Sequence, residues 1–552
     1  MGTRSGSFAA VMTQLIGSRV FENVIKQRRV RGITRFVIAS LVSCSPLAAQ
    51  GQAVQTVEGA VSGTVLEGGV QAWLGIPFAA PPVGDLRWKP PQPANRWTAT
   101  FAADRFAPSC MQPLRDHGIA YYVGDDPVAE DCLYLNVWAP PGASRTSGLP
   151  VIVYVYGGSF VAGSSRKPLY VGDRLAAKGA IVVGFNYRLG TLGFLAHPEL
   201  TAESPARASG NYGLLDQVAA LKWVNTNIAA FGGDPRRVTI MGQSAGSMSI
   251  ALLQTSPLAR GLFSRIVGLS GSVYLSTDSD RLPTRAEAES RGLAMQRALE
   301  APDLASLRRL PPDRIVALQG PSASPTIDGL FLTERPSATF ASRRQADVPL
   351  LIGTVADETL SPVSVARTLA EYRSALVTQY GANAGAVEAL YPATDDASAR
   401  AAALRLGHDA GFSTMARSWA RLQSTNGRAP VYAYLFDRKH PYAPGVVFSD
   451  LAPATTGVNH TDDVPYWLGT FDSMNSVRPT RDWTPLDRSL GERMQAAIVA
   501  FAARGDPNSA SLGVTWPRYR PDAEKTLSFG QATRVLTGWP NADRMDAMER
   551  LK

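Results

Sequence analysis

The chain has 552 residues, of which 45% are hydrophobic and 18% charged, so it can bury a large core and is neither a disordered nor a coiled-coil protein. Its formal net charge of +9 would fit a nucleic-acid-binding protein, but residues 1–53 carry seven basic residues and one acid. Only about +3 is left for the rest of the chain, which has no dense basic stripe. We therefore expect no nucleic-acid partner.

The first 53 residues have the pattern of an export leader. A basic stretch precedes a short apolar run that starts at Phe36, and small residues follow near Ala49 and Ala53. The run is too short for a permanent membrane span, and no other stretch is long and apolar enough for one. We expect an exported protein, periplasmic or secreted, whose true start is Met12 or whose leader is simply extended.

Leu41-Val42-Ser43-Cys44 also resembles a bacterial lipoprotein signal. In that alternative Cys44 would be lipidated and would anchor the protein to a membrane. A soluble export signal with cleavage a few residues later explains the same residues.

The three cysteines bear on the redox compartment. If Cys44 leaves with the leader, Cys110 and Cys132 remain as an even pair in an exported chain. This predicts a disulfide between them, worth about 3 kcal/mol on the chain-entropy account.

The predicted elements then alternate between strands and helices. A proline-rich irregular segment follows a strand end at 74–77, and helical spacing is clear over 213–230. Apolar runs predict buried sheet strands at 150–156, 180–188, 238–241, 265–270, 348–353 and 431–436, and the first of them is continuous, as expected of a strand covered on both faces. This order predicts an α/β protein with a large, mostly parallel central sheet and helices on both faces. We expect one domain over 54–552, with helical cap insertions around 284–345 and 366–425.

A Gly-x-Ser-x-Gly motif, Gly242 to Gly246, lies between a predicted buried strand and a predicted helix. This context is typical of a nucleophile elbow, whose turn is too sharp for side chains beside the serine. It would lift the Ser244 hydroxyl off the sheet and direct the Ala245 N–H to the same point. The alternative is a glycine-rich turn without chemistry.

The strand at 150–156 runs into Gly157-Gly158-Ser159-Phe160. A glycine pair after a buried strand exposes backbone N–H groups, as an oxyanion hole requires. A glycine-rich turn without a ligand is again the alternative.

A serine nucleophile needs a histidine base within hydrogen-bond reach. The chain offers five: His117, His197, His408, His440 and His460. In this hydrolase architecture the base follows the serine and the acid along the chain, which excludes the first two. His408 lies in a predicted helix, and His440 follows two basic residues in what we expect to be an exposed turn. His460, in a loop before an apolar segment, is the best candidate.

The acid that orients the histidine should end a strand between Ser244 and His460. The strand at 350–354 is followed by Asp357 and Glu358, and either carboxylate could hold the imidazole. The residues alone do not choose between them.

The chain resembles the type-B carboxylesterase family, which includes the cholinesterases and many bacterial esterases. The resemblance extends from about residue 56 to about residue 540. It rests on the ordered motifs Gly75-Ile76-Pro77, Pro81-Pro82 with Gly84, Glu130-Asp131-Cys132-Leu133-Tyr134-Leu135-Asn136, Tyr156-Gly157-Gly158, Asn186-Tyr187-Arg188-Leu189-Gly190, Asn211-Tyr212-Gly213 with Asp216-Gln217, Phe231-Gly232-Gly233-Asp234-Pro235, Gly242 to Gly246, Phe501, Gly505-Asp506-Pro507-Asn508 and Trp516-Pro517.

The resemblance implies the α/β-hydrolase fold and serine-dependent hydrolysis of small-molecule carboxylic esters through an acyl-enzyme, without a metal or cofactor. It implies a triad of Ser244, Glu358 and His460, and so decides between the two acids. It also implies the Cys110–Cys132 disulfide. The oxyanion hole that it implies consists of the N–H groups of Gly158, Ser159 and Ala245.

Three departures from the family pattern bear on the substrate. Ser159 replaces the third oxyanion glycine, and Gln243 replaces the usual acid before the nucleophile. The loop from Cys110 to Cys132 has tyrosines but no tryptophan to hold a quaternary ammonium. The last two departures argue against choline esters.

Two other functions remain as alternatives. One is a hydrolase specialised for lipids, amides or bulky natural esters. The other is a non-catalytic adhesion protein of the same fold, but such members lose the triad, which is complete here. The sequence does not predict the oligomeric state.

Overall fold

The computed structural model describes residues 53–276, 280, 282–318, 324–358, 363 and 366–551. The predicted leader, with Cys44, lies outside these residues apart from Ala53. Within the described part of the chain, no helix has the length and apolarity needed to cross a membrane.

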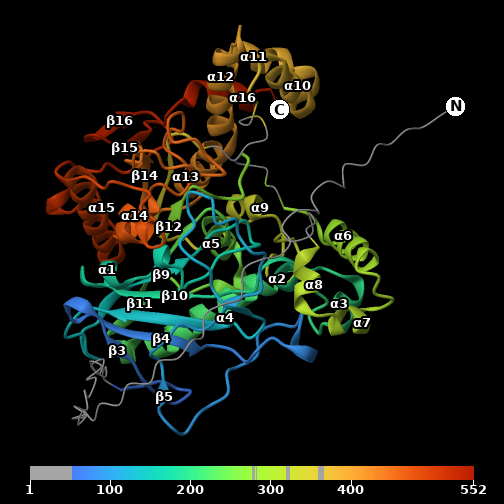
Figure 1. The fold of residues 1–552 in the computed structure, drawn as a ribbon, viewed down its shortest axis with the longest axis vertical. Helices are drawn as coiled ribbons and strands as arrows, with labels where there is room; N and C mark the ends of the chain where they lie inside the picture. The colour runs from blue at the N-terminus through green and yellow to red at the C-terminus, as the bar shows by residue number, and fades with distance from the viewer. Residues whose placement is uncertain are drawn as a thin grey trace, which may run out of the picture. The chain divides into compact units, whose positions relative to one another are not determined.

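An eleven-stranded sheet forms the centre of the described domain, in the order β16-β15-β14-β13-β12-β11-β9-β10-β8-β4-β3 (Figure 1). Its strands are β3 (Thr64–Val65), β4 (Gln71–Pro77), β8 (Tyr134–Ala139), β9 (Leu149–Val155), β10 (Ile181–Phe185), β11 (Gly233–Gln243), β12 (Arg265–Leu269), β13 (Leu350–Val355), β14 (Val431–Phe436), β15 (Lys525–Phe529) and β16 (Thr533–Thr537). All neighbours from β15 to β10 are parallel, and those at both edges are antiparallel. The predicted mostly parallel sheet is confirmed.

Among the described residues, five further short strands lie outside this sheet. Three of them form a small sheet, and two pair beside the disulfide: β1 (Val54–Gln55), β2 (Ala60–Ser62), β5 (Phe101–Ala102), β6 (Ser109–Cys110) and β7 (Val128–Ala129).

Two groups of helices contact the central strands. One group contains α4, α5, α9 and α13, which contact one another, and the other contains α1, α14 and α15. Their bounds are α1 (Asp173–Ala176), α4 (Tyr212–Asn227), α5 (Ala245–Thr255), α9 (Pro336–Ala341), α13 (Thr414–Asn426), α14 (Val464–Leu468) and α15 (Pro485–Arg504). The parallel strands are covered by helices, which explains why they are continuous apolar runs.

The remaining helices form two smaller apolar clusters beside the sheet. One cluster involves α2 (Gly190–Phe194), α3 (Pro198–Glu203), α6 (Arg285–Ala298), α7 (Leu304–Arg309) and α8 (Pro312–Ala317). The other involves α10 (Leu369–Tyr380), α11 (Ala384–Leu390) and α12 (Asp396–His408), which Figure 1 shows standing away from the sheet. In contrast, α13 packs on β13 and β14, so the end of the 366–425 segment belongs to the layer that covers the sheet.

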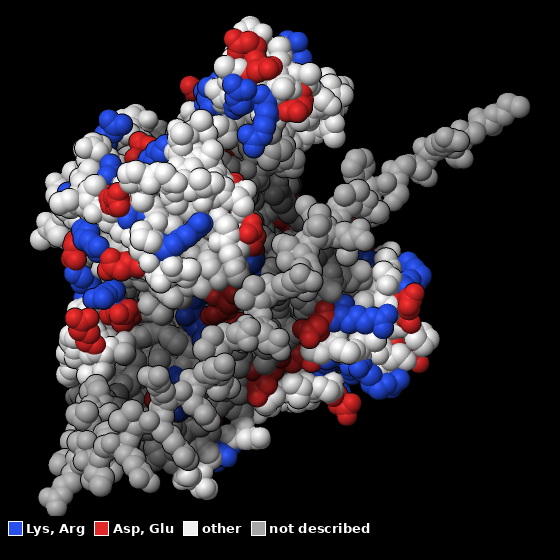
Figure 2. Space-filling model, in the orientation of Figure 1, with Lys and Arg blue, Asp and Glu red and all other residues white. Residues whose placement is uncertain are grey.

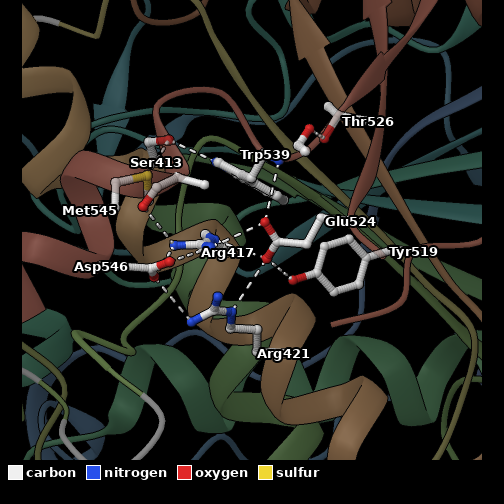
Figure 3. Close-up of polar contacts among 11 residues, drawn as sticks. Ser413, Arg417, Arg421, Tyr519, Glu524, Thr526, Trp539, Met545 and Asp546 are labelled. Carbon is white, nitrogen blue, oxygen red and sulfur yellow. Dashed lines mark hydrogen bonds and ion pairs between the residues drawn. The ribbon is translucent and has the colours of Figure 1, made fainter. Parts of the chain in front are cut away.

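The last helix, α16 (Ala542–Glu549), is joined to α13 by ion pairs to the buried Arg417 (Figure 3). Arg417 of α13 lies 2.9 Å from Glu524 and 2.6 Å from Asp546. Tyr519 donates a further hydrogen bond to Glu524 at 2.7 Å. Removing one partner would leave a buried charge unpaired, so this cluster fixes α13, whose first turn follows a π-helical turn at Asp409–Ser413.

The predicted disulfide is confirmed. Cys110 and Cys132 are bonded with their Cα atoms 5.0 Å apart. The bond closes a loop whose residues line the cavity described below.

Candidate active site

Ser244 lies between β11 and α5 with φ 56° and ψ −123°, which is a strained conformation for a residue other than glycine. An ideal Cβ on Gly242 would lie 2.5 Å from the Gly246 carbonyl. One on Gly246 would lie 2.0 Å from the Val155 carbonyl oxygen on the neighbouring strand. Space therefore requires glycine on both sides of Ser244.

A second turn packs directly against this elbow. An ideal Cβ on Gly157 would lie 2.5 Å from the Gln243 carbonyl oxygen and 2.8 Å from the Ser244 Cβ. Gly158, Ser159 and Phe160 follow with φ of 117°, 57° and 62°. Three consecutive residues in the left-handed region turn the chain sharply beneath the serine.

Three backbone N–H groups remain without a partner at this point. Gly158, Ser159 and Ala245 donate to no acceptor among the described residues. Ala245 is the first residue of α5, where the helix itself supplies no acceptor. The predicted oxyanion-hole residues therefore lie around the elbow with free donors.

Glu358 and His460 form the closest contact between the predicted triad residues. His460 Nδ1 lies 2.7 Å from Glu358 Oε2, and the carboxylate also accepts from the Val355 N–H at 3.4 Å. Glu358 is 1% exposed. Burial alone would raise its pKa, but the imidazole of His460 lowers the pKa below its ordinary value.

Asp357, the other candidate acid, contacts a different group. Its Oδ2 accepts from the Val458 N–H at 2.8 Å and lies against Gly457, where an ideal Cβ would be 2.0 Å away. Asp357 thus fixes the chain just before His460, and it makes no hydrogen bond with the imidazole.

The surroundings of His440 differ from those that its sequence neighbours predicted. The expectation of an exposed turn for His440 is wrong, because its side chain is buried and its Nε2 lies 2.8 Å from the Asp462 carbonyl. Burial, together with the charge of Arg481, lowers its pKa to about 3. The two basic residues before His440 indicated an exposed position. In the folded chain, however, Arg481 and Trp483, about forty positions later, cover its side chain.

The His460 ring is held by residues that the sequence analysis missed. Phe412, in the π-helical turn, stacks on it at 4.6 Å between centroids and 17° between planes. In the loop itself Asp462 accepts from the Asn459 N–H at 2.7 Å and so closes the turn around His460. An Asn-x-x-Asp spacing could have indicated this turn, but no sequence signal connects Phe412 to His460.

Gln243 lies at the Nε2 edge of the imidazole. Its Nε2 lies 3.1 Å from His460 Nε2 and 3.1 Å from Thr461 Oγ1. The Ser244 hydroxyl makes no hydrogen bond to any described residue, His460 included. The serine and the imidazole therefore share one site without being joined in this structure.

A single cavity of about 1300 Å³ contains these groups. Ser244, His460 and Gln243 line it, together with the turn at Gly158 and Ser159. Its other walls come from the disulfide loop, the two residues Ala366 and Arg367 before α10, the helix α12 and the loop before His460.

Comparison with known families matches residues 50–547 to the carboxylesterase family. The chain belongs to the carboxylesterase family. The predicted α/β-hydrolase fold and the predicted resemblance are thereby confirmed, and this carboxylesterase-family protein is a serine-dependent hydrolase of carboxylic esters.

Alignments with two relatives cover most of the chain. It is 39% identical over 510 residues to the fumonisin B1 esterase of Sphingopyxis macrogoltabida, with 88% of each chain covered. It is 36% identical over 494 residues to the para-nitrobenzyl esterase of Bacillus subtilis, covering 86% of this chain and 94% of that one. A solved thermophilic para-nitrobenzyl esterase has a TM-score of 0.76 at 33% identity, with 90% and 99% covered.

Proposed function

We propose that Ser244 is the nucleophile of this esterase, with His460 as its base and Glu358 as the acid that orients the base. The observation that carries the proposal is the 2.7 Å contact between the buried Glu358 and His460, which lines the same cavity as the strained Ser244. Since a carboxylate only accepts, Nδ1 carries the proton and the Nε2 lone pair is left for the serine.

In the first step His460 Nε2 takes the Ser244 proton while Oγ attacks the ester carbonyl carbon. The carbonyl oxygen becomes an oxyanion, which the N–H groups of Gly158, Ser159 and Ala245 would stabilise by about 3 kcal/mol for each donor. The C–O bond to the alcohol then breaks, and the alcohol leaves with the proton from Nε2. Water repeats the sequence on the acyl-enzyme and releases the carboxylic acid.

The test is the Ser244→Ala variant with a short-chain p-nitrophenyl ester. We expect kcat to fall at least about 10⁴-fold, and a phosphonylating reagent to label Ser244 of the unmodified protein, as mass spectrometry of the peptide would show. Turnover retained in Ser244→Ala, or a label on another residue, would contradict the assignment.

The size of the cavity supports bulky esters as the substrate class. At about 1300 Å³ it exceeds the roughly 300–1,000 Å³ that drug-sized ligands occupy. Relatives named for para-nitrobenzyl esters, fumonisin B1 and phenmedipham also suggest large substrates. An ester panel that varies the acyl and alcohol groups separately, read as kcat/KM, tests this; a steady decline with size would contradict it.

We also propose that the protein is exported. The leader pattern and the Cys110–Cys132 disulfide support this, because disulfides persist in oxidising compartments. Cell fractionation and the mass of the mature N-terminus test the proposal. A lipid adduct on Cys44 would show an anchored form, and an unprocessed cytoplasmic chain would contradict export.

A further inference from the structure

The contact between Gln243 and His460 occupies the atom of the imidazole that has to accept the serine proton. His460 Nδ1 faces the Glu358 carboxylate at 2.7 Å, so in the neutral ring Nδ1 carries the proton and Nε2 the lone pair. The group that faces this lone pair at 3.1 Å is the Gln243 amide nitrogen, which can only donate. The amide therefore fills the position that the Ser244 hydroxyl needs.

We propose that Gln243 is a positioning residue that occupies the Nε2 lone pair of the His460 imidazole in the resting enzyme and releases it to Ser244 when an ester binds. This inference rests on the proposed function of the triad and goes beyond it. It makes the residue before the nucleophile a competitor of the nucleophile for one lone pair.

Other contacts keep the imidazole in place while that lone pair changes partner. Phe412 stacks on the ring, and Glu358 holds Nδ1, so neither contact depends on what faces Nε2. The Gln243 amide has an anchor of its own in Thr461 Oγ1 at 3.1 Å. A short movement of the amide is thus enough to free Nε2.

An amide can form a hydrogen bond with Nε2 in both protonation states of the imidazole, whereas a carboxylate can do so only when Nε2 carries a proton. After His460 takes the serine proton, Nε2–H becomes a donor, and a turned amide presents its oxygen as the acceptor. A glutamate at position 243 could accept from the protonated ring but could not donate to the neutral ring. It would therefore favour the charged imidazole, which is not a base.

Other titratable groups also face this region. Glu358 comes from the end of β13, Asp463 from the start of α14, and His408 from the end of α12 acts on Glu358. Burial raises the pKa of Asp463 to about 6, against the effect of the Tyr434 hydroxyl. The titration of Asp463 must therefore be separated from any effect of position 243.

The experiment compares Gln243→Met, which keeps the length but removes the hydrogen bond, with Gln243→Glu. Without ester present, phenylmethylsulfonyl fluoride should modify Ser244 of Gln243→Met roughly fivefold faster than in the unmodified protein, because one competing hydrogen bond is lost. For Gln243→Glu, the acidic limb of the kcat/KM–pH profile should move up by about 1–2 pH units. The same shift should appear in an Asp463→Asn background.

The proposal is overturned if Ser244 of Gln243→Met is labelled no faster than Ser244 of the unmodified protein. It is also overturned if the acidic limb of Gln243→Glu coincides with that of the unmodified protein. The melting temperature of each variant checks its fold. If both variants fail to fold, Thr461→Ala decides: it keeps Gln243 but removes the anchor, so labelling should rise, and an unchanged rate overturns the proposal. Ser244→Ala separates the two hypotheses, because only failure of the triad assignment leaves that variant active.

Discussion

The two sides of this active site are built in different ways. The serine side consists of two glycine turns, at Gly157–Gly158 and Gly242–Gly246, which follow neighbouring parallel strands and touch through backbone atoms. The histidine side consists of His460 on a loop, Glu358 at the end of another strand and Phe412 in a π-helical turn, joined through side chains. Backbone sterics fix the first side, and polar and aromatic contacts across long sequence separations fix the second. Substitutions on the serine side should therefore destabilise the fold, and substitutions on the histidine side should reduce activity.

The largest expected effect breaks the serine side. In Gly246→Ala the new Cβ would lie 2.0 Å from the Val155 carbonyl oxygen in the middle of the sheet, so the elbow cannot form without moving β9. We expect a loss of more than about 4 kcal/mol in the free energy of unfolding, together with all activity.

Urea unfolding followed by circular dichroism measures this change. Gly385→Ala in α11 is the control, because an added Cβ there meets no atom within 4 Å. Equal stability of Gly246→Ala and Gly385→Ala would show that backbone space does not define the elbow.

The next effect tests the histidine side. Glu358→Gln keeps the size of the side chain but presents an amide to Nδ1, so the imidazole can take the wrong tautomer. We expect kcat to fall about 10³–10⁴-fold with little change in melting temperature. The matched variant Asp357→Asn should lose far less activity, because Asp357 contacts Val458 and not the ring. A larger loss in Asp357→Asn would reverse the assignment of the acid.

A smaller effect is expected from Phe412→Leu. Leucine keeps an apolar contact but cannot stack, so the imidazole gains freedom to tilt and kcat should fall about tenfold at nearly constant KM. Phe101→Leu, which removes the Trp97 contact far from the cavity, serves as the control for stability. A change confined to KM would place Phe412 in substrate binding instead.

The smallest effect concerns the turn around His460. Burial raises the pKa of Asp462 to about 7, although the Tyr121 hydroxyl and the Asn459 N–H lower it. In the unfolded chain this carboxyl has its ordinary pKa of 3.8 and has already released its proton where the folded protein still binds it. The stability that the bound proton contributes therefore declines as the pH rises from 4 to 7.

Asp462→Asn cannot release this proton. From pH 5 to pH 8 its free energy of unfolding should gain about 2 kcal/mol relative to the unmodified protein. Urea titrations at several pH values measure the difference. A constant difference would mean that Asp462 is already ionised at pH 5.

The sequence by itself determined the serine side, the fold class and the disulfide. Limited backbone space requires the glycines around Ser244 and after β9. Burial on both faces requires the apolar runs of the central strands. A run of adjacent residues contains all the information that these features need. For the same reason the residues alone could not choose between Asp357 and Glu358, which are neighbours on the chain.

Only the tertiary structure decided which groups surround His460. Phe412, the competing amide of Gln243, the turn held by Asp462 and the buried position of His440 all depend on contacts between segments far apart in the sequence. Side-chain direction at such contacts is set by the packing of several elements at once. No local pattern carries that information, so it appears only when the chain is folded.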